Sequence, residues 1–165
     1  MRVEIVEVGF LQTNCYFIIN ANDLIIVDPG ADYQKIKGKI GNYNLQAIFI
    51  THDHFDHTDA LAELLNDYNV PVNPKSVTGF EYEIISNPGH TKDSISFYFR
   101  KEKMIFVGDF IFYESIGRTD LEGGNHREML ESLQMIAAYP DETIIYPGHG
   151  LETTLGEEKS RFKHY

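Results

Sequence analysis

The chain has little cysteine, little positive charge and no long apolar run, and each shortage excludes a class of protein. Its one cysteine, Cys15, cannot form an internal disulfide. Lys and Arg number 14 against 25 Asp and Glu, which gives a formal net charge of −11, whereas binding to nucleic-acid phosphates favours a basic face. No apolar run reaches the roughly 18 residues of a transmembrane helix. We therefore expect a protein that binds neither nucleic acid nor membrane.

The start of the chain and its length narrow the class further. Residues 1–6 alternate like a strand and do not form the apolar core of a signal peptide, so we expect a cytoplasmic protein. A length of 165 residues predicts one domain, spanning residues 1–165. Cys15 lies in a strand-like run, where a packed core position is a better interpretation than a nucleophile.

Apolar periodicity predicts a mixture of strands and helices in both halves of the chain. In the second predicted helix, apolar residues recur at i, i+3, i+4 and i+7 from Leu61 to Tyr68, which buries one face. Asn125 followed by Glu128 resembles the capping box at the start of a helix. The predicted helices cover about 32–41, 57–68, 125–138 and 157–164. The predicted strands lie near 2–8, 14–20, 24–28, 45–50, 70–73, 80–86, 94–100, 103–108 and 143–146.

The densest cluster of polar residues is the run 51–57, Thr-His-Asp-His-Phe-Asp-His, between a strand-like and a helix-like segment. His52 and His54 are two residues apart, so on an extended chain both side chains point the same way and could bind one metal ion. Asp56 and His57 would face a second position at the start of the helix. The alternative is a polar helix cap with incidental histidines, which so many imidazoles and carboxylates disfavour.

Three further candidate ligands each follow a predicted strand. His90 and His149 sit in two similar Pro-Gly-His turns, where Pro-Gly ends the strand and directs the next side chain from its tip. Asp109 follows the apolar run 104–107 in the same way. His126 and His164 match no such pattern, and we expect His126 to be solvated.

The order His-x-His-x-Asp-His, Pro-Gly-His-Thr, Gly-Asp and Pro-Gly-His-Gly resembles the metallo-β-lactamase superfamily, especially its small hydrolases related to glyoxalase II. Segments 11–16, 27–30, 117–124 and 153–159 resemble the opening strands, first turn, Gly-rich loop and closing segment of those hydrolases. The resemblance implies an α/β (α+β) protein with the metallo-β-lactamase fold, a four-layer αβ/βα sandwich in a compact version. One fold hosts many chemistries, so the motifs define the fold better than the substrate.

The resemblance also implies a ligand set, a cofactor and a reaction. His52, His54 and His90 would hold one divalent ion, Asp56, His57 and His149 a second, and Asp109 would bridge them. Zinc is the first expectation, with iron or manganese as alternatives. A bridging hydroxide would attack the acyl carbonyl of a small thioester of hydroxyacylglutathione type, or of a related ester or lactone. Asp56 would also orient the hydroxide. Asp28, Thr51 and Ser94 would orient the ligand histidines, although plain turn or strand roles are equally open to them.

Arg118, on the Gly-rich loop, is the candidate substrate-binding residue. At this position relatives carry a cationic residue, and a guanidinium binds a carboxylate through paired hydrogen bonds; the alternative is a surface ion pair with Asp120 or Glu122. The stretch between His57 and His90 is shorter than in most relatives, so the pocket is either open or completed by another subunit of a homo-oligomer. Gly150 and Leu151 follow His149 where glyoxalase II has a substrate-contacting tyrosine.

Two other functions stay open at this point. A relative with the same motifs is an iron oxygenase that acts on glutathione persulfide with one iron. A non-catalytic member of the fold is the third alternative, which the complete set of ligands disfavours.

Overall fold

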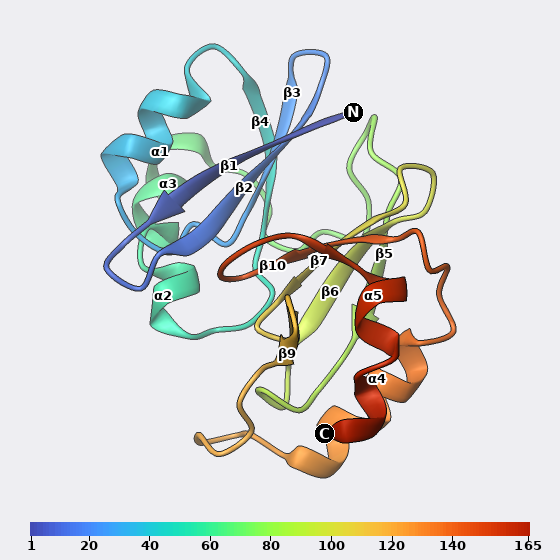
Figure 1. Ribbon diagram of the computed structural model, residues 1–165. Helices are drawn as coiled ribbons and strands as arrows, with labels where there is room; N and C mark the ends of the chain where they lie inside the picture. The colour runs from blue at the N-terminus through green and yellow to red at the C-terminus, as the bar shows by residue number, and fades with distance from the viewer. The chain divides into compact units, whose positions relative to one another are not determined.

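A computed structural model describes all residues 1–165, which divide into two compact units, Met1–Glu81 and Tyr82–Tyr165 (Figure 1). Each unit combines one main β-sheet with helices. Both units also contain one pair of parallel strands joined by a crossover helix. This βαβ arrangement packs the helix against the sheet.

The first unit is built on a four-stranded sheet in the order β1-β2-β3-β4. β1 (Arg2–Val8), β2 (Thr13–Asn20) and β3 (Asp23–Val27) are antiparallel neighbours, and β4 (Asn44–Phe49) is parallel to β3. The crossover helix between them is α1 (Tyr33–Ile40). Two further helices follow β4, α2 (Phe55–Thr58) and α3 (Leu61–Tyr68).

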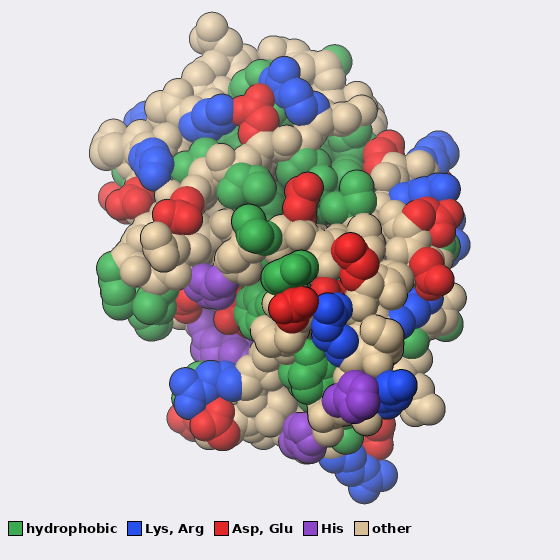
Figure 2. All heavy atoms as spheres, viewed as in Figure 1, with side chains coloured by type: hydrophobic (Ala, Val, Ile, Leu, Met, Phe, Trp, Pro, Cys, Tyr) green, Lys and Arg blue, Asp and Glu red, His purple; other side chains and the backbone are tan.

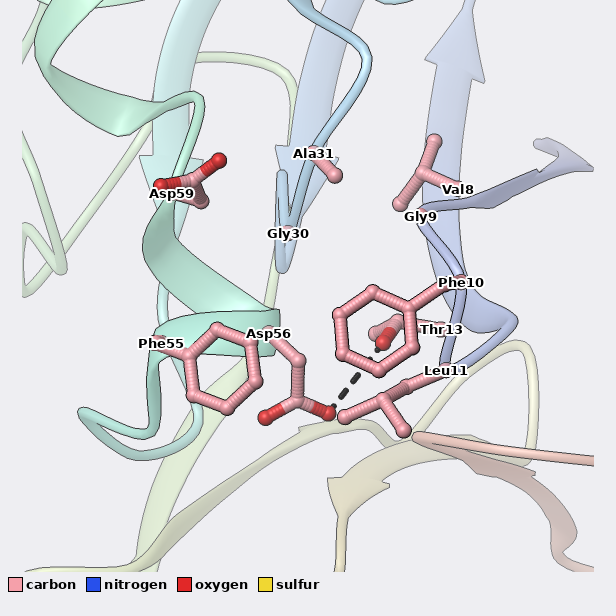
Figure 3. Close-up of a pocket in the computed structure, with 10 residues that line it drawn as sticks. All are labelled: Val8, Gly9, Phe10, Leu11, Thr13, Gly30, Ala31, Phe55, Asp56 and Asp59. Atoms are coloured by element: carbon pink, nitrogen blue, oxygen red, sulfur yellow. Dashed lines mark hydrogen bonds between the residues drawn. The ribbon is translucent and has the colours of Figure 1, made fainter.

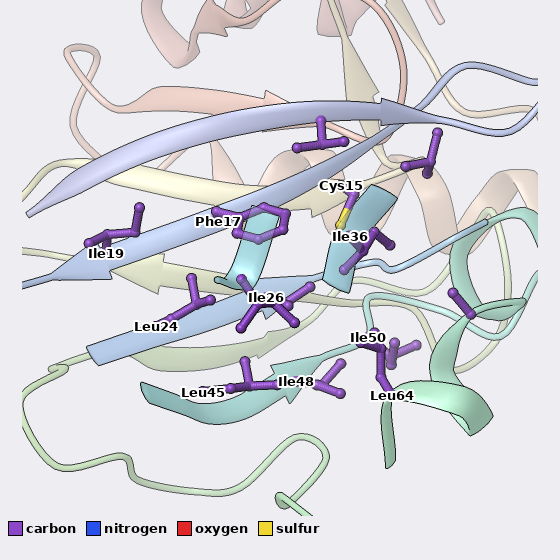
Figure 4. Packing of buried hydrophobic residues seen from close by; sticks show 14 residues of the cluster. Cys15, Phe17, Ile19, Leu24, Ile26, Ile36, Leu45, Ile48, Ile50 and Leu64 are labelled. Atoms are coloured by element: carbon purple, nitrogen blue, oxygen red, sulfur yellow. The ribbon is translucent and has the colours of Figure 1, made fainter. Parts of the chain in front are cut away.

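Helices α1 and α3 hold this sheet through one apolar cluster (Figure 4). Ile36 and Ile40 of α1 and Leu64 of α3 are fully buried with Phe17 and Ile26 of the sheet. Cys15 belongs to the same cluster, and burial raises the pKa of its thiol well above the usual value. The expectation of a packed core position for Cys15 is therefore confirmed.

The second unit is built on a five-stranded sheet in the order β11-β10-β7-β6-β5. Its central parallel pair is β7 (Met104–Gly108) and β10 (Ile144–Pro147), joined through α4 (His126–Ile136). The antiparallel strands are β5 (Glu83–Ser86), β6 (Ile95–Phe99) and β11 (Thr153–Thr154). The remaining elements are β8 (Ile111–Phe112), β9 (Ser115–Ile116), α5 (Leu155–Lys159) and the 3-10 helix η1 (Phe162–His164).

Helix α4 covers the second sheet with Met129, Leu133 and Ile136, which pack with Ile105 and Ile145. Asn125 caps this helix by accepting hydrogen bonds from the N–H groups of residues 127 and 128. The full capping box that we expected there occurs instead at α5, between Thr154 and Glu157.

Strand direction places the candidate ligands of each unit at one edge of its sheet. In the second unit β5, β7 and β10 run the same way, so His90, Asp109 and His149 all follow strand ends at the same edge. In the first unit β1, β3 and β4 run the same way, so the turn after β1, Asp28 and the run 51–57 share an edge. Sites at the carboxyl ends of strands are common in α/β proteins.

The helix predicted over 157–164 is divided into α5 and η1. Two other predicted elements were wrong, and in both the backbone hydrogen bonding explains the difference. The helix over 57–68 is interrupted between α2 and α3, because the Ala60 N–H donates to the Pro29 carbonyl (3.1 Å) outside the helix. The strand over 70–73 is only an isolated bridge between Val72 and Ile48, since Pro71 has no N–H to continue a ladder. No helix combines the length and the apolar character required to cross a bilayer.

Candidate metal centre

The donor atoms of the first unit form two close pairs. His52 Nε2 and His54 Nδ1 are 3.1 Å apart, close to the roughly 3.3 Å between two nitrogens bound to one tetrahedral zinc at 2.0–2.1 Å. His57 Nε2 and Asp56 Oδ2 are 3.6 Å apart. The run 51–57 thus brings its imidazole and carboxylate donors together in two close pairs.

A buried carboxylate fixes the orientation of two of these imidazoles. Asp28, only 2% exposed, accepts from the Thr51 N–H (2.8 Å) and hydroxyl (2.7 Å) and lies 2.9 Å from His57 Nδ1. The same Thr51 hydroxyl lies 3.0 Å from His52 Nδ1. Because the Thr51 proton goes to Asp28, its oxygen is left to accept from His52. Both rings then carry their proton on Nδ1, so Nε2 is the nitrogen whose lone pair can bind a metal.

The second unit contains one carboxylate between two imidazoles. Asp109 Oδ2 lies 3.7 Å from His90 Nε2, and Asp109 Oδ1 lies 3.6 Å from His149 Nε2. Each oxygen of Asp109 therefore faces a different imidazole, so this carboxylate could serve two neighbouring ions. The side chain of His149 is 28% exposed, against 4% for His90.

The backbone of the Gly-rich loop contacts both His90 and Asp109. The sequence did not predict these backbone contacts. The Arg118 carbonyl accepts a hydrogen bond from His90 Nδ1 (2.8 Å), so His90 also presents Nε2. A Cβ added to Gly117 would lie 1.8 Å from the Asp109 carbonyl oxygen. Only glycine therefore allows the loop to pass this close to Asp109.

The Arg118 side chain forms the surface ion pair that was the alternative interpretation. Its Nε and Nη2 donate to the two oxygens of Asp120 at 2.7 and 2.8 Å. This guanidinium lowers the pKa of Asp120 to about 2. Binding of a substrate carboxylate by Arg118 stays a prediction, and it would require the guanidinium to leave Asp120 or share it.

Of the residues expected to orient the candidate histidines, two contact them and one does not. Asp28 and Thr51 contact the candidate ligands His57 and His52. Ser94 bonds instead to the hydroxyl (2.7 Å) and N–H (3.2 Å) of Thr91, so it stabilises the turn after His90. His126 and His164 are exposed, and the expected solvation of His126 is confirmed.

The donor chemistry of both units suits a divalent metal. Imidazole nitrogens and carboxylate oxygens are the ligands of zinc and non-haem iron sites. Histidines 52, 57 and 90 each place Nδ1 against a polar partner, which leaves Nε2 as the nitrogen suited to bind an ion. Orientation of this kind is typical of metal-ligating histidines.

Comparison with known proteins places the chain in a family. Residues 8–74 and 74–149 match the model of the metallo-beta-lactamase superfamily. The chain belongs to the metallo-β-lactamase superfamily. Among curated relatives, the "Probable metallo-hydrolase YqgX" of Bacillus subtilis is 31% identical over 98% of this chain and 96% of the relative. "Hydroxyacylglutathione hydrolase GloC" of Haemophilus influenzae is 29% identical over 96% of this chain and 95% of its own length.

Solved structures agree with this membership. The BLEG-1 B3 metallo-β-lactamase is 30% identical, covers 96% of this chain and 97% of its own, and has a TM-score of 0.92. TTHA1623, solved in a di-iron-bound form, is 29% identical over 94% of this chain and 96% of its own, with a TM-score of 0.84. ETHE1 from Myxococcus xanthus is 26% identical over 96% of this chain and 82% of its own, also at 0.84.

These similarities confirm the expected fold class and, at a coarse level, a metal-binding hydrolase of the superfamily. The ligand assignments, the number and identity of the ions and the substrate stay predictions.

Proposed function

We propose that the protein is a metal-dependent hydrolase of small acyl compounds, with a thioester of hydroxyacylglutathione type or a related ester or lactone as substrate. The observation that carries the proposal is Asp109, whose two oxygens each face a different histidine nitrogen at 3.6 to 3.7 Å. This arrangement lets one carboxylate serve two neighbouring ions, which favours a centre with two metals over one. The name of the GloC relative supports the thioester class.

The proposed centre uses all the motif residues. One ion would be held by His52, His54 and His90 and a second by Asp56, His57 and His149, with Asp109 shared between them. Zinc is the first choice, while the di-iron form of TTHA1623 supports iron as an alternative. When bound, two such ions supply Lewis acidity and a water molecule with a pKa lowered toward 7.

The protein's own groups then orient the reaction. Asp56 accepts a hydrogen bond from the Thr13 hydroxyl (3.3 Å) through Oδ2, and we assign its carboxylate to orient the attacking water. Water adds to the acyl carbon, the bond from that carbon to sulfur or oxygen breaks, and the products are a carboxylic acid and a thiol or alcohol. Asp28 and Thr51 prevent the imidazoles of His52 and His57 from rotating during the reaction.

The expected partners follow from the same proposal. The substrate is a small anionic acyl compound, with Arg118 as the group that binds its carboxylate. We keep the prediction of no nucleic-acid partner. The face drawn in Figure 2 supports it, because acidic and basic side chains are interspersed there. We also propose that the protein is cytoplasmic and does not bind membranes. Both a monomer and a homo-oligomer are compatible with the proposal.

One alternative function has specific support. A mononuclear iron oxygenase acting on a persulfide would use the same motifs, and the similarity to ETHE1 fits it. It differs in requiring one iron and molecular oxygen. A non-catalytic fold member remains the third hypothesis, disfavoured because no ligand is missing from the sequence.

The deciding experiment measures metal stoichiometry and activity together. The full chain is reconstituted anaerobically with zinc and with iron in parallel, and bound metal per chain is measured. Each form is then assayed with S-lactoylglutathione, with a lactone and, for oxygen uptake, with glutathione persulfide. We expect two ions per chain and thioester or lactone hydrolysis, both lost in Asp109→Ala and His149→Ala.

The matched control is His126→Ala, which removes an exposed histidine outside the proposed set. It should keep both ions and full activity. One iron per chain with persulfide-dependent oxygen uptake would replace the hydrolase by the oxygenase. A protein that binds neither metal would revive the non-catalytic hypothesis.

A further inference from the structure

An apolar pocket opens in the first unit beside Asp56 (Figure 3). Its cavity volume is about 80 Å³, well below the roughly 300–1,000 Å³ typical of pockets for whole drug-sized molecules, so it has room for one small group of a substrate. Its walls are mostly apolar and come from the turn after β1, the loop after β3 and helix α2. Its lining includes Phe10, Leu11, Ala31, Phe55 and Asp56.

Two exposed aromatic side chains define the mouth of the pocket. Phe10 is 83% exposed and Phe55 is 60% exposed, and their rings stack with centroids 6.3 Å apart. Figure 2 shows apolar side chains gathered in the same region, at the β1–β2 turn and α2. Exposing so much aromatic surface to water is unfavourable, and contiguous exposed apolar surface commonly marks a binding site.

The local backbone holds this pocket in place before any ligand binds. Gly9 has a positive φ of 69°, and its N–H donates to Asp32 Oδ2 (2.9 Å). The Gln12 N–H closes the turn on the Gly9 carbonyl at 3.3 Å. On the other wall, a Cβ added to Gly30 would lie 1.6 Å from the Asp56 carbonyl, so α2 packs directly on this loop. A preformed pocket avoids the entropy cost of ordering on binding.

The carboxylate of Asp56 lies in the wall of the pocket. Asp56 lies between the two aromatic rings in the view of Figure 3, and the Thr13 hydroxyl bonds its carboxylate. Asp56 is the residue assigned above to orient the attacking water. A group that fills the pocket would therefore lie next to the atoms that react.

We infer that this pocket binds the apolar part of the acyl group of the substrate, a short alkyl chain or a phenyl ring attached to the scissile carbonyl. The inference rests on the proposed function and narrows it to substrates with such an acyl group. An apolar group matches the lining, and the size and the adjacent Asp56 favour part of a small substrate over a protein partner, which needs a far larger surface.

The test compares acyl chain lengths in the metal-loaded full chain. Hydrolysis of 4-nitrophenyl acetate and 4-nitrophenyl hexanoate is measured for the wild type, Phe10→Ala, Phe55→Ala and Met135→Ala. We expect the wild type to favour the hexanoate in kcat/KM by about tenfold or more, as buried methylene groups do. Phe10→Ala and Phe55→Ala should reduce this ratio about fivefold, and Met135→Ala should not. Met135 is a matched control because it is apolar, 43% exposed and outside the pocket.

A binding arm makes the inference independent of catalysis. Hexanoate and acetate are titrated into the metal-free wild type and Phe10→Ala, and the amide NMR shifts of Leu11 and Ala31 are followed. Hexanoate should move both amides in the wild type only, and acetate should move neither. This result would support the pocket even if no ester were hydrolysed, in which case only the proposed function fails.

Two results would overturn the inference. One is an unchanged hexanoate-to-acetate ratio in both phenylalanine variants, together with no selective shift of the two amides. The other is a concentration-dependent dimer that Phe10→Ala disrupts while the ratio is unaffected, because the patch would then be an interface between copies of the chain.

Discussion

At the scale of single residues, the site is determined by atoms that never touch a metal. His57 owes its ring orientation to Asp28, at 2.9 Å, and His52 owes its orientation to Thr51, at 3.0 Å. Asp28 itself has a positive φ of 51° and its N–H donates to Phe49 in β4 (2.9 Å). The parallel pairing of β3 and β4 therefore brings Asp28 to the run that begins at Thr51.

We expect Asp28→Asn to lower zinc affinity about 10- to 100-fold, because an amide no longer accepts strongly from both Thr51 and His57. Competition against a chromophoric chelator measures the affinity. Asp23→Asn is the matched control, since Asp23 lies at the opposite end of the same strand and bonds only to Asn44 and Gln46 among the side chains described. Equal affinities in all three proteins would contradict the orienting role of Asp28.

The pair of Arg118 and Asp120 makes a second prediction at this scale. The pKa of Asp120 is lowered to about 2, so the ion pair is fully formed above the unfolded value near 3.8 and is lost only as pH falls through about 2. Over the neutral range the pair is therefore constant, and its exposure makes it worth little stability.

If Arg118 binds the substrate carboxylate, releasing it from Asp120 should improve that binding. We expect Asp120→Asn to lower KM for an anionic thioester about two- to fivefold and Arg118→Ala to raise it by a similar factor or more. A neutral ester should respond to neither, and Glu122→Gln is the control for loop charge. Unchanged KM values in both variants would leave Arg118 as a surface ion-pair residue.

At the scale of elements, the loop between β9 and α4 shows what the sequence could and could not predict. The Gly-rich segment was identified as functional through Arg118, whose side chain the structure places on Asp120. The backbone role of the same loop had no signal in residue type, because any residue has a carbonyl. Gly117 was visible in the sequence, yet its contact with Asp109 depends on two segments brought together by folding.

A substitution at Gly117 tests that contact. We expect Gly117→Ala to displace the loop or Asp109, to weaken metal binding at least tenfold and to destabilise the protein, because the added Cβ would lie 1.8 Å from a backbone oxygen. Gly38→Ala is the matched control in α1, where the added Cβ meets nothing within 4 Å. It should stabilise the protein by about 0.5–1 kcal/mol. Metal titration and chemical denaturation of both variants give the answer.

Periodicity predicted the long elements better than the short ones. The helix at 126–136 and the central strands have a clear apolar pattern, and their predicted bounds differ from the observed ones by one or two residues. The two-residue strands β8, β9 and β11 were not predicted, since two residues carry no period. The break between α2 and α3 was missed because it depends on the distant Pro29 carbonyl.

At the scale of the whole molecule, the candidate ligand residues could be identified because they occur in four short motifs after strand ends. The pocket beside Asp56 was not, because Phe10 and Phe55 are 45 positions apart and have no shared motif. They meet because β1 and β4 run in the same direction in one sheet. Sequence patterns therefore show the donors, while topology selects the neighbours that give them specificity.

The proposed sharing of ions between ligands of both units makes the last prediction. Metal that binds only the folded state raises the unfolding temperature, so zinc should raise it in the wild type and in His126→Ala. His52→Ala and Asp109→Ala should each remove most of the rise. If their ligands serve the same centre, the double variant loses little more than either single one. If each unit bound its own ion, the two losses would add, and thermal unfolding of the four proteins with and without zinc distinguishes these outcomes.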